Sequence, residues 1–466
     1  MPTNSRVHKY PASCIQEQFW LINRLHPANT AYNIPSLFRL KGPLNTDFIK
    51  QSVSEITRRH DIFRMTFTSE NGELQQIVVD ESLFAFSLVN LTDTNSEIIE
   101  EQLQSLISSE VKKPFDLEQG PLLRVTLFCI SDDEHYLLIM MHHIITDLRS
   151  KELFSSELSY FYNALIRGKT TNLPSPEQQY KDYSLWQKNW LGSGEYEAML
   201  EHWRKHLSNH SGYLNLPTDH PRQPVQILSG GSMPFNLPQS FSDSLKEFSR
   251  QKNVNIFLTL LTAYLILLFR YTVQKDIIIG VPLTNRRQNS HKDFLGCFVN
   301  ILPLTFTVSN DMTFDEVLRQ VRLEMLAAHR NQEMPYEQMV KKLHTKRDPS
   351  YNPFFQVGFT FEPPMELEFA GLEITTQKIH NQGTQLDLFL NLWEKEEEVH
   401  GFIEYNKELF DDSTLTRFAG HYKTLLQAIL TDQDHLISTL PILPKAEKNE
   451  ISVAWYSTQK ELPEKK

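Results

Sequence analysis

The chain has 466 residues, about three times the ~150 residues of a typical domain, which excludes a single small fold. Hydrophobic residues make up 40% of the sequence and aromatic residues 11%, which is enough to build large cores. The 57 acidic residues outnumber the 46 basic residues and give a formal net charge of −11, which argues against a general nucleic-acid binder.

Helix and strand signals alternate from the start of the chain. Apolar residues within 44–56 recur on one helical face, and a strand is expected over residues 62–67. An Asn-Gly turn at 71–72 leads into a second strand over 75–79, so these segments predict a helix followed by a hairpin. A further amphipathic helix is expected over 101–111.

A buried strand and a long helix come next. Residues 122–130 predict one strand, and the almost unbroken apolar run over 135–141 is typical of a central strand covered on both faces. Asp147 stands where the following helix should begin, and Gly168 is a plausible end for it. The polar segment 169–179 contains two prolines and is the best linker in the chain.

The second half also mixes helices and strands. The pattern predicts helices over 256–269, 314–325 and 415–429 and strands over 276–283, 386–393 and 400–405. Thr313 and Glu316 form a capping box ahead of the middle helix. The run 256–269 has 14 residues, which is short of the ~20 that a membrane span needs, so we expect a buried core helix.

The cysteines and the N-terminus indicate the compartment. Cys14, Cys129 and Cys297 are scattered and odd in number, and no spacing suggests a disulfide framework or a structural zinc site. Residues 1–16 lack the apolar core of a signal peptide. We therefore expect a cytoplasmic protein with neither nucleic acid nor membrane among its partners.

The strongest chemical signal is the run Met-His-His-Ile-Ile-Thr-Asp over residues 141–147. His142 and His143 leave a buried strand, and Asp147 follows four residues after the second histidine. A histidine placed there can offer one ring nitrogen to a cleft while the other is held by a neighbour. By spacing alone, two polar residues at a strand end and a helix cap explain the run equally well. A metal site is the weaker interpretation because adjacent residues on a strand point to opposite sides.

Other chemical motifs are absent from the sequence. There is no GxSxG element and no cysteine with a histidine partner nearby in the sequence, so no acyl-enzyme nucleophile stands out. The 16 glycines form neither of the usual phosphate-binding loops. An enzyme built from this sequence should therefore join two substrates that arrive already activated.

Seven segments, taken together and in order, resemble the condensation domains of nonribosomal peptide synthetases. Residues 141–147 resemble the active-site motif MHHxxxDG of that family. The other six segments resemble SxAQxRLWxL, RHExLRTxF, YxDYAxW, IGxFVN, HQDxPFE and RDxSxNP, and they lie at residues 13–21, 59–67, 180–186, 295–300, 331–337 and 347–353. The resemblance covers nearly the whole chain, from about Pro11 to Pro444.

The resemblance implies an α/β (α+β) fold of two lobes, each like chloramphenicol acetyltransferase, which meet in a V-shaped pseudodimer around a central active-site tunnel. We place the first lobe at residues 1–175 and the second at 176–444. Residues 445–466 resemble a linker toward a downstream adenylation domain, so we expect an excised piece of a larger synthetase that is monomeric by itself.

The resemblance also implies an activity. A donor carrier protein brings an acyl or peptidyl thioester, an acceptor carrier protein brings an aminoacyl thioester, and the acceptor amine attacks the donor carbonyl to form an amide. Both cargoes hang on 4'-phosphopantetheine arms, and no cofactor bound covalently to this chain is expected. Segment 27–44 most resembles the subtype that accepts an L-configured donor, with starter-type and polyketide-fed domains as alternatives.

By position in the motif, His143 is the catalytic residue, either as a general base toward the amine or as a group that positions the amine and stabilises the tetrahedral intermediate. His142 and Asp147 are expected to support the active site structurally, and Arg286 is the candidate ion-pair partner of Asp147.

One departure from the motif matters most. Leu148 stands where the family has glycine, and with Thr146 and Asn300 it is expected to shape the tunnel. Leucine adds four carbons beside the reacting centre, which leaves two alternatives to amide formation between carriers. The first alternative, which Leu148 motivates, is a noncatalytic platform that docks carriers, and the second is a relative that acylates or esterifies a free small molecule.

Overall fold

The computed structural model describes residues 7–95, 97–171, 173–208, 213–286, 294–343, 348–431 and 435–458. The first residue of the segment 347–353 lies outside these residues. Within the described part of the chain, no single helix has the length and apolar character of a membrane span. The helix pair 239–251 and 256–272 passes that test only together, with a bend of 100°.

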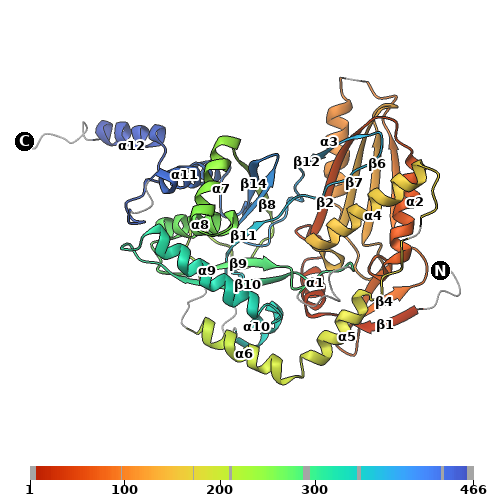
Figure 1. The fold of residues 1–466 in the computed structure, drawn as a ribbon, viewed down its shortest axis with the longest axis horizontal. Coiled ribbons are helices and arrows are strands. Elements are labelled where there is room, and N and C mark those ends of the chain that lie inside the picture. Colours follow the sequence, from red (N-terminus) through yellow and green to blue (C-terminus); the bar gives the residue numbers. More distant parts are fainter. Residues whose placement is uncertain are drawn as a thin grey trace, which may run out of the picture.

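The first half of the chain forms a five-stranded sheet and a small three-stranded sheet (Figure 1). The five-stranded sheet has the order β12-β2-β7-β6-β5, in which β12 (Glu373–Gln377) comes from the second half of the chain, and the small sheet has the order β1-β4-β3. The strands of this half are β1 (Val7–Pro11), β2 (Asn33–Lys41), β3 (Met65–Glu70), β4 (Glu73–Val79), β5 (Ala85–Asn90), β6 (Leu123–Cys129) and β7 (Glu134–His142). The helices are α1 (Cys14–Leu25), α2 (Thr46–Arg59), η1 (Asp61–Arg64), α3 (Ile99–Val111), η2 (His143–Ile145), α4 (Leu148–Ile166) and α5 (Tyr180–Trp190).

The second half is built on a six-stranded sheet with the order β10-β9-β11-β13-β14-β8. Its strands are β8 (Gly230–Leu237), β9 (Asp276–Leu283), β10 (Asn300–Thr307), β11 (Val357–Phe361), β13 (Leu388–Lys395) and β14 (Glu398–Asn406). Its helices are α6 (Gly194–Leu207), α7 (Gln239–Gln251), α8 (Ile256–Thr272), α9 (Phe314–Arg330), α10 (Tyr336–Leu343) and α11 (Asp412–Thr431). Helix α12 (Lys445–Thr458) projects from this half (Figure 1).

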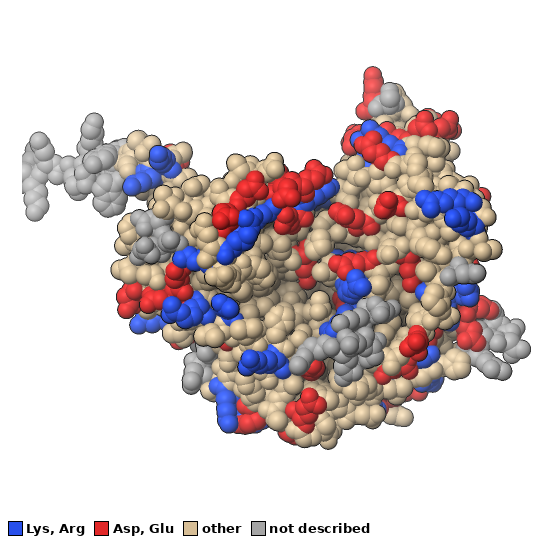
Figure 2. Space-filling model, viewed as in Figure 1, with Lys and Arg blue, Asp and Glu red and all other residues tan. Residues whose placement is uncertain are grey.

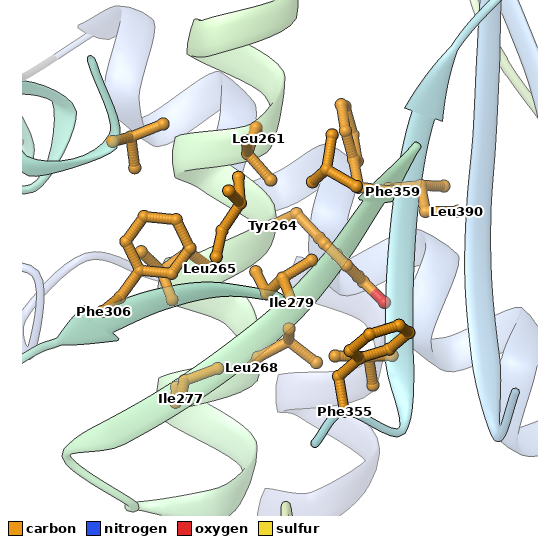
Figure 3. Close-up of a cluster of buried hydrophobic side chains, with 14 of the residues drawn as sticks. Leu261, Tyr264, Leu265, Leu268, Ile277, Ile279, Phe306, Phe355, Phe359 and Leu390 are labelled. Atoms are coloured by element: carbon orange, nitrogen blue, oxygen red, sulfur yellow. The ribbon is translucent and has the colours of Figure 1, made fainter. Parts of the chain in front are cut away.

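Helix α8 is the core helix that the apolar run predicted. Its side chains from Thr259 to Phe269 are all buried. Figure 3 shows Tyr264 and Leu268 packed against Ile279 of β9 and Phe359 of β11. Burial of this kind contributes roughly 1.5–3 kcal/mol for each large apolar side chain, so the packing of α8 stabilises the six-stranded sheet. The opposite face of that sheet can then contribute side chains to the site.

Three features of the fold differ from the sequence prediction. The strand expected at 62–67 begins only at Met65, because the preceding turn is held by Arg64, whose guanidinium donates to Thr57 O at 3.0 Å and to Val79 O at 2.6 Å. Residues 445–458 form a helix where only a polar linker was expected. Strand β12 (Glu373–Gln377) lies in the second half of the sequence yet pairs antiparallel with β2 of the first half.

The two halves are further joined by segment 294–298. Phe294, Leu295, Cys297 and Phe298 come from the second half of the sequence but pack in the hydrophobic core of the first half. This insertion brings the second half of the chain directly beneath the end of β7, where the two histidines lie. The boundary expected at residue 175 stays a prediction.

Candidate active site

The end of strand β7 is shaped by a tight backbone turn. β7 lies between β2 and β6, so its last residues emerge from the middle of the five-stranded sheet. The backbone N–H of Ile144 donates to Nδ1 of His142 at 3.0 Å, and the N–H of His143 donates to Tyr32 O at 2.9 Å. These bonds end the strand and turn the chain into η2, so the two adjacent histidines face different surroundings.

His142 faces the core. Its side chain packs at the edges of the Phe19 and Phe115 rings, with centroids 6.2 Å and 5.9 Å away. Burial lowers the pKa of His142 to about 3, and the neighbouring His143 and Arg124 act in the same direction. Nδ1 of this neutral imidazole is occupied by the Ile144 N–H and so holds the turn, whereas the supporting role of His142 in the active site stays a prediction.

His143 faces a cavity. Its Nδ1 lies 2.8 Å from the carbonyl oxygen of Thr146. Because a carbonyl can only accept, Nδ1 carries the proton and Nε2 keeps its lone pair. The Phe19 ring stacks on the imidazole with a centroid distance of 5.3 Å and an interplanar angle of 29°. The ring is therefore fixed in position and tautomer, and its basic nitrogen is free for chemistry.

The protonation state of His143 follows from its surroundings. Burial lowers the pKa of the imidazole below its usual value, and the charge of Lys151 acts in the same direction, partly opposed by Asp147. The ring is thus neutral near pH 7, which is the state in which Nε2 can accept a hydrogen bond or a proton.

Asp147 and Arg286 form the ion pair that the sequence led us to expect. The Nη2 of Arg286 donates to the two carboxylate oxygens at 3.0 Å and 3.1 Å, and both side chains are only 4% exposed. Asp147 also caps helix α4 by accepting from Ser150 N at 2.8 Å, and it accepts from Phe298 N at 3.0 Å. The contact is confirmed, whereas its importance for activity stays a prediction.

A glycine allows segment 294–298 to approach this site. The hydroxyl of Ser150 donates to Gly296 O at 2.6 Å and accepts from Gly296 N at 2.9 Å. A Cβ at position 296 would lie 1.9 Å from the Tyr180 ring, which cannot move away because its hydroxyl donates to Cys297 O at 2.6 Å. The IGxFVN-like and YxDYAxW-like segments therefore meet at one tightly packed contact.

A cavity of about 210 Å³ opens in front of His143, with walls from both halves of the chain. The first-half wall comes from β2, η2 and the start of α4, and the second-half wall comes largely from the face of the six-stranded sheet. The lining residues that the argument uses are His143, Thr146, Leu148, Lys151, Thr360, Glu362, Phe389, Asn391 and Glu404.

The residues predicted to shape a tunnel divide into two groups. Leu148 is half-buried and lines the cavity, as does Thr146. Asn300 is not among the cavity-lining residues. Its side-chain amide donates to Gln332 O at 2.8 Å and to Met334 O at 2.6 Å, and its Oδ1 accepts from Tyr336 N at 3.0 Å. The structure therefore gives Asn300 a linking position between β10 and α10 rather than a place on the wall.

Sequence reasoning missed Lys151, Glu362 and Glu404, all of which line the cavity. Lys151 could have been found, because it follows Leu148 by three residues and so shares its helix face. Glu362 and Glu404 reach the cavity only because β11 and β14 lie in the same sheet as β9, which no local pattern reveals. Among the residues that the structure describes, no three His, Cys, Asp or Glu side chains gather so that they could hold a metal ion.

Comparison with known proteins agrees with this geometry. The family profile described as "Condensation domain" matches residues 6–452. The chain is 35% identical over 457 residues to part of a linear gramicidin synthase protein of Brevibacillus parabrevis, and this match covers 97% of the chain but 6% of that relative. The chain therefore spans a small fraction of the length of this curated relative.

Two solved structures show the same fold. A four-domain nonribosomal peptide synthetase bound to AMP and glycine matches 96% of this chain and 35% of its own, with a TM-score of 0.86 and 21% identity. The first condensation domain of the calcium-dependent antibiotic synthetase, in complex with a substrate analogue, matches 93% of this chain and 100% of its own, with a TM-score of 0.79 and 17% identity.

Proposed function

This chain belongs to the condensation domain family of nonribosomal peptide synthetases, and from that premise we propose that it forms an amide bond between two carrier-bound cargoes, with His143 as its catalytic residue. The donor is an acyl or peptidyl thioester and the acceptor is an aminoacyl thioester, each on a 4'-phosphopantetheine arm. Donor and acceptor carrier proteins and a neighbouring adenylation domain are the partners that this proposal requires.

The single observation that carries the proposal is the free Nε2 of a neutral imidazole facing a cavity lined by both halves. Nδ1 is held by Thr146 O, so the ring presents one fixed basic nitrogen. Two tethered cargoes that meet in front of it react as if at high local concentration, which supplies much of the rate.

The reaction balances with one base. The acceptor amine attacks the donor carbonyl, and the tetrahedral intermediate collapses by breaking the C–S bond. The amine loses one proton to Nε2 of His143, and the departing thiolate of the donor arm takes a proton back. An α-amino group has a pKa of about 7.7–8.0, so part of it is neutral near pH 7 and can attack the carbonyl without first losing a proton. His143 then has to align the amine and accept its proton as the C–N bond forms.

The other active-site residues act by holding His143 in place. The Asp147–Arg286 pair joins helix α4 to segment 294–298 and so fixes the backbone around Thr146, whose carbonyl orients the imidazole. Leu148 lines the same cavity, and we assign to it a limit on cargo size. The intact arrangement around His143 favours catalysis over a purely docking role.

Reconstitution with loaded carriers tests the proposal. One carrier domain bears acetyl-L-alanyl-pantetheine and a second bears L-leucyl-pantetheine, and mass spectrometry of the intact acceptor follows the transfer. The expected result is acetyl-alanyl-leucyl product on the acceptor, with none when the donor carrier is unloaded.

Other outcomes favour the alternatives. A panel of further cargoes extends the test, because the natural ones are unidentified. Absence of product from every pair, with both carriers still bound, favours a noncatalytic docking domain. Product with untethered leucine methyl ester or an alcohol, but not with the loaded acceptor carrier, favours an acyltransferase that uses a free small molecule.

A further inference from the structure

The cavity wall beside His143 carries a lysine, Lys151. Lys151 lies in the first turn of α4, three residues after Leu148, so both side chains are on the helix face that lines the cavity. In the described part of the chain we find no hydrogen bond or ion pair to its ammonium. The neighbouring Arg149 differs, because it pairs with Glu152 at 3.0 Å at the surface and is not among the cavity-lining residues.

Three acidic residues, Asp147, Glu362 and Glu404, also line the cavity. Asp147 is compensated by Arg286. On the opposite wall, Glu404 of β14 is 3.2 Å from His380, and Glu362 follows the end of β11. Burial raises the pKa of Glu362, while the charge of Lys151 opposes that shift. In the view of Figure 2, acidic and basic side chains are interspersed over the molecule rather than gathered in one basic patch. Among the described residues that line the cavity, Lys151 is the basic residue on the same wall as His143, and Glu362 is an acidic residue on the opposite wall.

We propose that Lys151 is a positioning residue whose ammonium disfavours a second positive charge in the cavity, and thereby holds both the His143 imidazole and the incoming acceptor amine in their neutral, reactive forms. The part that concerns the amine rests on the proposed amide formation. The part that concerns His143 depends only on the structure of the free protein.

The physical reason is that two positive charges repel each other more strongly in a partly buried cavity, where less water screens them, than they do in bulk water. Only the neutral amine attacks a thioester, yet an α-amino group with a pKa of about 7.7–8.0 is largely protonated at pH 7. A unit positive charge in the same partly buried cavity lowers the pKa of such a group by about half a unit to one unit. That shift increases the neutral fraction several-fold, and Glu362 acts in the opposite sense.

Titration of His143 tests the charge effect without any substrate. The protein is labelled with ¹⁵N at its histidine rings, and the His143 signals are assigned by their loss in His143→Asn. We expect Lys151→Met to raise the pKa of His143 by about half a unit to one unit, and Glu362→Gln to lower it. Lys151→Arg and the matched control Arg149→Met should leave it unchanged. An unmoved His143 titration in Lys151→Met overturns the proposal.

The pH dependence of amide formation tests the effect on the amine. With the acetyl-alanyl donor and leucyl acceptor carriers, Lys151→Met should move the midpoint of the kcat/KM profile to higher pH by a similar amount. The Lys151→Met variant should be several-fold slower than the wild type at pH 7 and as fast as the wild type near pH 9. The Lys151→Arg variant keeps the positive charge and should show the wild-type profile. Arg149→Met should follow the wild-type profile throughout.

The possible failures are distinguishable. An equal loss in Lys151→Met at every pH means that the ammonium contacts the reacting atoms or the cargo, and it overturns the proposal. If the wild type forms no product at any pH, the proposed function fails, while the His143 titration still decides whether Lys151 controls charge in the cavity.

Discussion

The two walls of the cavity are built in different ways. The first-half wall is held by hydrogen bonds to its polar groups: Nδ1 of His143 is bonded to Thr146 O, and the carboxylate of Asp147 is bonded to Ser150 and, from the second half, to Arg286 and Phe298. The second-half wall is the face of a sheet whose support is the apolar packing of α8 on its other side. Its polar side chains include Asn391, whose amide donates to Phe389 O at 3.2 Å, and Glu404, which is 3.2 Å from His380.

This difference indicates where chemistry and selectivity lie. A wall in which Nδ1 of His143 and the carboxylate of Asp147 are held by several hydrogen bonds keeps one geometry, which suits a catalytic imidazole. A sheet face can exchange cavity-facing side chains without disturbing its buried face, because alternate residues point to opposite sides. We therefore expect substitutions in the first wall to affect stability and rate, and those in the second wall to affect the choice of cargo.

Breaking the Asp147–Arg286 pair should have the largest effect. Asp147→Ala or Arg286→Met leaves one buried charge without its partner, which costs about 3–5 kcal/mol in the free energy of unfolding. Urea denaturation measures this loss. The double substitution removes both charges and should be less damaging than the sum of the single ones. Strictly additive losses would contradict the idea that the pair acts as a unit.

Acid should weaken the first wall through His142. The folded state holds this residue with a pKa of about 3, whereas the unfolded chain binds a proton with a pKa near 6.5, so stability is complete above pH 6.5 and is lost as the pH falls toward 3. Between pH 7 and pH 5 we expect a loss of roughly 2 kcal/mol from this group. In His142→Asn, which does not titrate, the measured decline should be smaller by that amount. An unchanged decline would show that protonation of His142 does not contribute to the loss of stability in acid.

Shortening Leu148 sharpens the comparison, because this residue belongs to the first wall yet contacts the cavity directly. Leu148→Ala should cost only about 1 kcal/mol, since the side chain is half-buried. It should lower KM several-fold for acceptors larger than leucine and leave His143-dependent turnover of smaller ones intact. Competition between alanyl and tryptophanyl acceptor carriers measures the change, and an unaltered ratio would show that Leu148 does not limit cargo size.

The smallest effect on stability is expected in the second wall. Thr360→Val and Asn391→Leu replace cavity-facing polar groups with apolar ones of similar size, and each should change the free energy of unfolding by less than about 1 kcal/mol. The same variants should shift preference toward apolar cargo, as measured by kcat/KM for leucyl against seryl acceptors. A large loss of stability without a change in preference would show that the sheet face is a structural wall as well.

Local patterns predicted much of this fold. The capping box at Thr313 and Glu316 is present at the start of α9, and β9 spans Asp276–Leu283 as expected. Long-range pairing was not predictable, because β12 joins β2 through residues more than 300 positions apart and carries no local signal of that partner.

The site, like the fold, was predictable where the signal is local and unpredictable where it depends on long-range pairing. His143 and Asp147 stood out through the active-site motif, and Arg286 was the candidate partner of Asp147; the Asp147–Arg286 contact is present, and His143 and Asp147 line the same cavity. Asn300 is not among the cavity-lining residues, because its side chain is bound to Gln332 O and Met334 O, and these long-range partners carry no local signal in the sequence. Glu362 was missed because its place on the cavity depends on the strand order of the second sheet.

The most direct test of the account is the single-turnover rate of amide formation by His143→Ala, with carriers loaded and saturating. Positioned general acid–base groups contribute about 10²–10⁴-fold, so we predict a rate at least roughly 100-fold below the wild type, in a variant that a cooperative urea transition shows to be folded. A rate within tenfold of the wild type would contradict the claim that the imidazole of residue 143 carries the chemistry.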